Sequence, residues 1–182
     1  KLPLWQLMMK NIYALGSYQI NSKNFMLNIW YSNPATGVDI PYLPKGHLQG
    51  KQLLQVMGLD QLDQQEDRSP DGLFDFVNGV TIDAANGLII FPRVEPFGTY
   101  LKQQLINAGD ASLVNNYVFQ ALYDSSLVAA QQEPNLDRFW IRGTFQSSVS
   151  SDISLNALNV PQGSVIVTAG CIKLKENVDY TV

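Results

Sequence analysis

The run Phe25-Met26-Leu27-Asn28-Ile29-Trp30-Tyr31 decides the fold prediction for this chain of 182 residues. It is rich in aromatic and other apolar residues, and such runs are typical of β-strands. Asn33-Pro34 and Gly37 follow it and predict a turn, because these residues favour tight changes of chain direction. The run 139–145 has the same character and predicts another strand.

Further short strands are predicted around tight turns. Residues 80–82 and 88–91 flank a turn that ends in Asn86-Gly87, and this pair supplies the positive φ angles that a hairpin turn needs. Because short connections join antiparallel neighbours, we predict antiparallel pairing. A meander is predicted near the C-terminus, with strands at residues 164–168, 171–175 and 178–182.

Helical periodicity predicts about three short helices between the strands. Apolar residues recur at helical spacing in residues 51–62, 99–107 and 113–122. Gly109 lies just beyond the second of these segments, where glycine often ends a helix. The sequence therefore predicts an α+β fold, predominantly antiparallel β, with a sandwich-like core and about three short helices.

Composition places the chain among folded proteins and narrows its partners. Hydrophobic residues make up 46% of the chain and charged residues 15%, whereas disordered chains carry few apolar residues. The 12 basic residues stand against 16 acidic ones, for a net charge of −4. Without a basic stripe, nucleic acid is not an expected partner. No apolar run approaches the roughly 20 residues of a membrane-spanning helix.

We expect residues 1–182 to be a single domain excised from a longer protein. The chain begins Lys1-Leu2-Pro3 without an initiator methionine, and residues 179–182 have the composition of a strand in mid-course. Within the domain, residues 1–132 are predicted to be mixed α and β, and residues 133–182 to be a β meander. The length suits one domain, or two small ones that share a core.

The residue types needed for nucleophilic or metal catalysis are scarce. His47 is the only histidine and Cys171 the only cysteine, so an internal disulfide and a zinc site are both excluded. No nucleophile elbow or glycine-rich nucleotide loop is present. We expect His47 to be a solvated loop residue and Cys171 a small buried residue of a strand. The sequence therefore predicts that the chain is not an enzyme.

Two other kinds of site stay open at this point. A carboxylate pair for glycoside hydrolysis depends on the fold, and four residues are candidates for it: Asp39, Glu95, Asp124 and Asp137. The tryptophans Trp5, Trp30 and Trp140 have the chemistry of a sugar-binding face, although at such positions tryptophan more often packs in a core or an interface.

An acidic loop resembles the front of a calcium-binding loop. Its oxygen-bearing side chains fall at relative positions 1, 3, 5 and 9, with Gly72 at position 6. These four candidate calcium ligands are Asp67, Ser69, Asp71 and Asp75. Position 12 is Asn78, not the bidentate glutamate of the full pattern, and Pro70 is unusual inside such a loop. The alternative is an acidic turn whose side chains cap backbone N–H groups.

Several blocks of the sequence, taken together in order, resemble the SprA/Sov family. The first is Pro3-Leu4-Trp5-Gln6-Leu7-Met8-Met9-Lys10-Asn11-Ile12-Tyr13. The second and third are Pro70-Asp71-Gly72-Leu73-Phe74-Asp75-Phe76 and Gly87-Leu88-Ile89-Ile90-Phe91-Pro92-Arg93-Val94-Glu95-Pro96-Phe97-Gly98. The others are Leu122-Tyr123-Asp124-Ser125-Ser126, Ala130-Gln131-Gln132, residues 163–170 and residues 178–182. None of these blocks is a catalytic signature. Cys171 stands where the family's last hairpin has glycine.

This resemblance implies a place in the outer membrane of Gram-negative Bacteroidetes. The family forms the translocon of the type IX secretion system, which exports folded cargo and supports gliding motility. Its partners include a PorV-type shuttle, a plug protein and cargo proteins. The family's membrane barrel would lie in the remainder of the chain, because the repeated lipid-facing alternation of a barrel wall is absent here. We therefore expect a soluble, non-catalytic domain at the cell surface or on the periplasmic face, serving as a scaffold or docking surface.

A cell-surface carbohydrate-binding β-sandwich module is the alternative function. In that case the tryptophans would act as stacking platforms for sugar rings. A hydrolase that uses a carboxylate pair is a third hypothesis.

Overall fold

The computed structural model describes residues 4–63, 65–147, 161, 163–169 and 172–176. The chain divides into two compact units, Lys1–Val149 and Ser150–Val182. The boundary lies after residue 149, not between the segments 1–132 and 133–182 that the sequence predicts. The reason is that the strand at Phe139–Ser147 pairs with the first long strand of the chain and so belongs to the first unit. Whether the chain is one excised domain stays a prediction.

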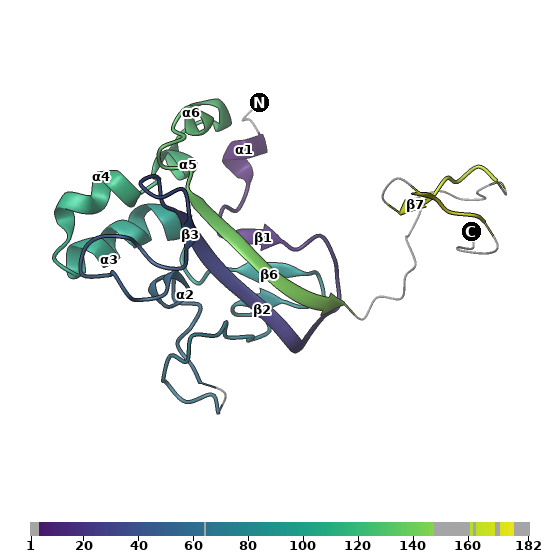
Figure 1. Cartoon of the computed structure of the whole chain (residues 1–182), viewed down its shortest axis with the longest axis horizontal. Helices are drawn as coiled ribbons and strands as arrows, with labels where there is room; N and C mark the ends of the chain where they lie inside the picture. Colours follow the sequence, from purple (N-terminus) through teal and green to yellow (C-terminus); the bar gives the residue numbers. More distant parts are fainter. Residues whose placement is uncertain (1–3, 64, 148–160, 162, 170–171, 177–182) are drawn as a thin grey trace. The chain divides into compact units, whose positions relative to one another are not determined.

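The first unit carries most of the regular structure (Figure 1). Its strands are β1 (Ile12–Ala14), β2 (Ile20–Ser32), β3 (Asp39–Ile40), β4 (Ile82–Asp83), β5 (Leu88–Ile90) and β6 (Phe139–Ser147). Its α-helices are α1 (Leu4–Leu7), α2 (Leu53–Val56), α3 (Leu101–Asn107), α4 (Val114–Tyr117), α5 (Ala121–Asp124) and α6 (Leu127–Gln131). Two further turns of helix, η1 (Pro96–Tyr100) and η2 (Ala111–Leu113), precede α3 and α4. In the second unit, β7 (Thr168–Ala169) and β8 (Ile172–Lys173) form an antiparallel hairpin.

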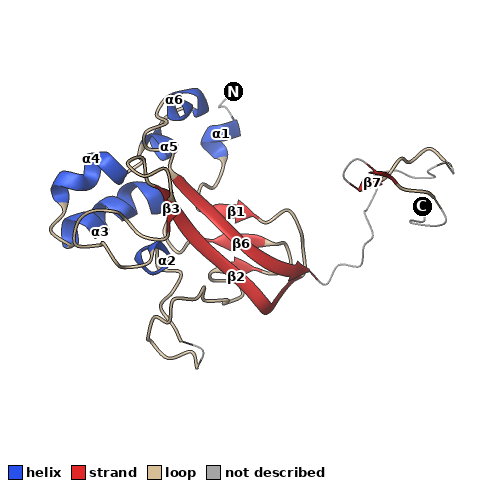
Figure 2. Ribbon diagram, in the orientation of Figure 1, coloured by secondary structure: helices blue, strands red, loops and turns tan. Residues whose placement is uncertain are grey.

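The strands of the first unit form two antiparallel sheets of three strands each (Figure 2). One has the order β3-β2-β6 and the other β1-β5-β4. In the first sheet, β2 and β6 are the long strands, and their register places Leu27 opposite Gly143 and Trp30 opposite Trp140. In the second, Tyr13 of β1 and Ile82 of β4 both face Ile89 of β5. An α+β fold dominated by antiparallel sheet is therefore confirmed.

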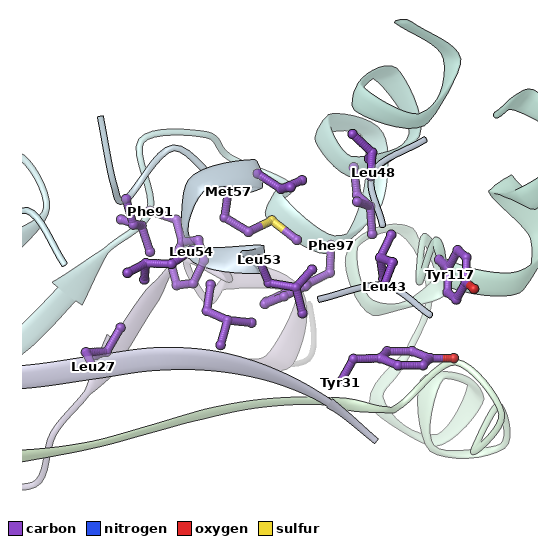
Figure 3. Close-up of a cluster of buried hydrophobic side chains, with 14 of the residues drawn as sticks. Leu27, Tyr31, Leu43, Leu48, Leu53, Leu54, Met57, Phe91, Phe97 and Tyr117 are labelled. Carbon is purple, nitrogen blue, oxygen red and sulfur yellow. The ribbon is translucent and has the colours of Figure 1, made fainter. Parts of the chain in front are cut away.

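The core lies between the two sheets and extends under α2 and α3. Alternate residues of β2 turn inward, and Ile29 has no exposed surface, as period-two alternation requires. Ile82 and Ile89 of the second sheet are equally buried. The short helix α2 contributes Leu53 and Leu54 to the same cluster (Figure 3). One hydrophobic core thus joins both sheets to the helices.

A bulge interrupts the pairing of β2 with β6 between Asn21 and Met26. Asn24 takes a positive φ of 59° there, and this conformation is better tolerated by asparagine than by most residues. The bulge directs Phe25 onto two rings of the loop that precedes β4, at 5.3 Å from Phe74 and 5.1 Å from Phe76 between ring centroids. The acidic loop region is thereby connected to the long strand.

The helices are shorter and more numerous than the sequence predicts. The described residues form six α-helices where about three were expected. The predicted helix 51–62 reduces to α2, because Gly58 takes a φ of 77° and ends it. The predicted helix 113–122 is interrupted at Val118, whose ψ of 118° is extended.

The predicted strands near the C-terminus are only partly described. Of the segments 164–168 and 171–175, only β7 and β8 remain as strands. The predicted strand 178–182 and Cys171 lie outside the described residues, so the expectations for them stay predictions.

We expect Ile29→Ala to lower the free energy of unfolding of the first unit by about 2–5 kcal/mol, because it leaves a cavity in the core. Met26→Ala is the matched control. It lies in the same strand but is 64% exposed, so its effect is expected to be small. Urea unfolding followed by tryptophan fluorescence measures both. Equal effects of the two substitutions would contradict the assigned inward and outward faces of β2.

Candidate functional site

The structure places the predicted calcium ligands in capping roles. Asp75 accepts hydrogen bonds from the backbone N–H of Gln61 at 2.7 Å and of Leu62 at 3.3 Å. Asp71 accepts one from Leu73 at 2.9 Å. The backbone N–H of Ser69 donates to the carbonyl of Asp67 at 2.8 Å. The capping alternative is therefore what Asp71 and Asp75 show.

No three acidic, histidine or cysteine side chains come together as a metal-binding group in the part of the chain that the structure describes. Asp67, Ser69, Asp71 and Asp75 are all exposed or half-buried. Calcium binding by this loop stays a prediction that solution measurements must test.

Asp60, which the sequence analysis did not single out, organises the same loop. Its side chain is almost fully buried and accepts hydrogen bonds from the backbone N–H groups of Asp71 at 3.0 Å and Gly72 at 3.1 Å. Burial raises the pKa of Asp60, and the nearby charges of Asp75 and Asp71 add to this, although the two backbone hydrogen bonds oppose it. The only sequence signal was an aspartate directly after the buried residue Leu59.

His47 is tied to a buried carboxylate. Its Nδ1 lies 2.7 Å from Oδ1 of Asp110, and its backbone N–H donates to Oδ2 at 2.6 Å. Burial alone would raise the pKa of Asp110, but the hydrogen bonds from His47 outweigh it and lower that pKa. Among the described residues the imidazole hydrogen-bonds to Asp110 alone, so the pair anchors the loop before α2 to the end of α3. The His47 side chain is 75% exposed, so the expectation of a solvated loop residue is confirmed, although the contact with Asp110 was not predicted.

Two of the four candidate carboxylates for glycoside chemistry, Asp39 and Glu95, are held in separate networks. Asp39 pairs with Arg142 at 2.7 Å, and hydrogen bonds from Ser32 and Arg142 lower its pKa. Glu95 accepts hydrogen bonds from Thr99 at 2.5 Å and Gln120 at 3.0 Å, and these lower its pKa. Asp124 is exposed. These contacts give Asp39 and Glu95 structural roles.

Three segments far apart in the sequence meet at Tyr123. Its hydroxyl accepts a hydrogen bond from the backbone N–H of Phe97 at 3.0 Å, and its carbonyl accepts one from Nζ of Lys10 at 3.3 Å. Burial raises the pKa of Tyr123 well above its usual value. Gly98 is required here, because a Cβ at this position would lie 2.6 Å from the Tyr123 ring. The N-terminal segment is thereby fixed against η1 and α5.

Two cavities lie along β6, and we call them the first and second β6 cavities. The first has a volume of about 380 Å³ and the second about 350 Å³. Both are walled by β6 on one side and by β1 or its flanks on another, and Ile141 lines both. The first is lined by Trp5, Met8, Met9, Lys10, Ile12, Tyr13, Phe97, Phe119, Leu122, Leu136, Asp137, Phe139, Trp140 and Ile141. The second is lined by Ala14, Leu15, Phe25, Met26, Leu27, Ile141, Arg142, Gly143 and Phe145.

The first β6 cavity opens to the surface through large apolar side chains. Met9 is 71% exposed, Met8 59% and Trp140 51%. Methionine and tryptophan are the kinds of side chain that adapt to, or anchor, a bound partner. The indole nitrogen of Trp5 is buried and has no hydrogen-bond partner in the described structure, and a buried donor of this kind costs free energy until an acceptor reaches it. The cavity therefore has the chemistry of a binding site.

The outer face of the β2–β6 pair carries the other two tryptophans. Trp30 and Trp140 stand directly opposite each other in the register, and the guanidinium of Arg142 lies 5.2 Å from the Trp140 ring centroid. Figure 2 shows no helix covering this face. The expectation that tryptophans at such positions pack in the core is wrong for Trp140, because it lies on the outward-facing register of an edge strand.

Comparisons with known proteins do not place the chain in a family. No protein-family model matches it. No curated protein matches it either. Within the described ranges, the helices are all too short or too polar to pass through a membrane.

We expect Asp75→Ala to lower the free energy of unfolding by about 1 kcal/mol, because two backbone N–H groups lose their acceptor. The loss is expected with and without EDTA, and thermal melts under both conditions measure it. Asp67→Ala is the control, since the side chain of Asp67 is exposed. The calcium hypothesis instead requires that EDTA lower the melting temperature of the unaltered chain and that Asp71→Ala remove this response. An unchanged melting temperature on chelation would exclude it.

Proposed function

We propose that this chain is a non-catalytic docking domain of an outer-membrane protein-secretion translocon of the SprA/Sov type. Its task in this proposal is to hold a partner or cargo protein during type IX secretion. A PorV-type shuttle, a plug protein and exported cargo are the candidate partners. The domain would work at the outer membrane, on the cell surface or the periplasmic face.

One observation carries this proposal. The blocks of sequence that resemble the family converge on the first β6 cavity and supply more than half of its lining. The N-terminal block contributes Trp5, Met8 and Met9, and two later blocks contribute Phe97 and Leu122. Residues that are remote in the chain thus build one apolar, surface-open site.

The chemistry of this site favours binding over bond-making. Its lining is almost entirely apolar, and the charged side chains in it are Lys10 and Asp137. Lys10 is already engaged with the carbonyl of Tyr123 and lies 4.6 Å from the Trp5 ring centroid. Exposed methionines beside aromatic anchors are typical of surfaces that recognise other proteins.

We expect a photo-crosslinking amino acid at Met9, at the rim of the first β6 cavity, to crosslink the full-length gene product to a secretion-system protein in living cells. The same amino acid at Ile106 is the control, because Ile106 is exposed on α3 and lines neither cavity. Mass spectrometry identifies the captured proteins. Capture from Ile106 alone, or of proteins unrelated to secretion from Met9, would contradict the proposal.

A cell-surface carbohydrate-binding module is the second candidate function. The paired Trp30 and Trp140 favour it, because an exposed indole stacks on sugar rings. The adjacent ion pair of Arg142 and Asp39 offers both a donor and an acceptor for hydroxyl groups.

If this second function holds, titration with purified cell-surface glycans gives saturable binding that Trp140→Ala abolishes and Val128→Ala preserves. Val128 is the control because it is 63% exposed and lies on helix α6, outside the sheet that carries both tryptophans. Isothermal calorimetry measures the binding. Glycan binding that survives Trp140→Ala would remove the outer face from consideration.

A further inference from the structure

From Phe139 to Phe145, strand β6 is an edge strand with one side unpaired among the described residues. Its sheet has the order β3-β2-β6, so within the described structure β6 pairs with β2 alone. The backbone N–H of Ser32 donates to the carbonyl of Arg138 at 2.8 Å. Backbone groups of an antiparallel strand alternate in direction. Those of Trp140, Arg142 and Thr144 therefore point toward β2, and those of Phe139, Ile141, Gly143 and Phe145 point away from it.

The unpaired side of β6 coincides with the two β6 cavities. Residues 139–141 line the first cavity, and residues 141–143 and 145 line the second. Side chains of a strand project to one face at every second residue. A strand placed along β6 would therefore turn apolar side chains at alternate positions into these two cavities.

The charged side chains near this end of the edge do not select the occupant. Lys10 and Asp137 line the first cavity, and Arg138 directly precedes β6. Lys10 also interacts with Glu95 and lowers the pKa of that carboxyl, so acidic groups balance the basic ones at this end of the edge. The occupant is therefore defined by the free backbone groups of β6 and the two apolar cavities, and not by charge.

We propose that β6 binds an extended segment of a partner protein by strand addition. The segment pairs with the backbone of Phe139, Ile141, Gly143 and Phe145, and it places alternate apolar side chains in the two β6 cavities. This mode of recognition combines backbone hydrogen bonds for affinity with pockets for specificity. The inference rests on the proposed docking function and names the form of the docked partner.

The test uses the 182-residue chain and a phage-displayed library of random extended peptides. We expect the enriched peptides to share apolar residues at alternate positions. In hydrogen exchange with a selected peptide bound, the amides of Phe139, Ile141, Gly143 and Phe145 should slow by about tenfold or more. The amides of Trp140, Arg142 and Thr144 should already be slow without peptide. Protection elsewhere, or no enrichment, would overturn strand addition.

A pair of substitutions isolates the backbone contribution. Phe145→Pro removes an N–H that points away from β2, whereas Phe145→Ala removes the same ring and keeps the N–H. We expect Phe145→Pro to bind the selected peptide about tenfold more weakly than Phe145→Ala, as the loss of one hydrogen bond predicts. Thermal melts show whether Phe145→Pro folds. If it does not, the exchange measurement on the unaltered chain decides. Equal affinities in two folded variants would contradict strand pairing.

The two proposals fail in distinguishable ways. Crosslinking from Met9 without alternating amide protection would leave the docking function standing and remove strand addition. Alternating protection without capture of a secretion-system protein would support strand addition and remove the proposed function.

Discussion

The antiparallel pairing of β2 with β6 is the constraint on which the rest of the first unit depends. It joins residues more than 100 positions apart, from Met26 opposite Thr144 to Tyr31 opposite Phe139. On one face it buries Leu27 and Ile29 in the common core, and on the other it exposes Trp140. Because side chains alternate along a strand, a shift of one residue would exchange these faces. The register of β2 with β6 therefore determines the positions of both the β6 cavities and the tryptophan pair.

That register requires a glycine at position 143. A Cβ at this position would collide with the carbonyl oxygen of Met26 and lie 2.9 Å from the Cα of Leu27. The backbone of β2 leaves no space for a side chain here, close to the bulge in β2. Only a residue without a side chain permits this approach, so the bulge and the glycine act as one feature. Both lie beside the second β6 cavity, because Gly143 and Met26 line it.

Local sequence patterns predicted the strands well and the contacts between them poorly. The run at residues 25–31 lies in β2, as predicted, and the turn at Asn86-Gly87 directly precedes β5. Both features were predictable because each depends on a few consecutive residues. The partner of β2 was not predictable, since nothing in the run itself specifies residues 139–145. Helix lengths were overestimated, because tertiary packing around Gly58 and Val118 overrides the apolar periodicity.

The candidate site was predictable in its components and not in its assembly. Trp5 and Trp140 were noted as isolated aromatic residues, and only the fold brings them to one cavity. The acidic loop was noted for its spacing, but its organiser is the buried Asp60 beyond that spacing. The contact of Lys10 with Tyr123 joins two blocks of the family resemblance. Such convergence is a property of chain topology, which short-range patterns do not encode.

The position of β6 as the last strand of the first unit has a mechanical consequence. The chain leaves β6 at Ser147, which pairs with Ile20, the residue where β2 begins. A force that pulls the chain before Ile20 away from the chain after Ser147 would act on one end of the β2–β6 pair. The hydrogen bonds between the two strands would then break one after another and not all at once. The separation would start at the weakest stretch, where the bulge already interrupts the ladder.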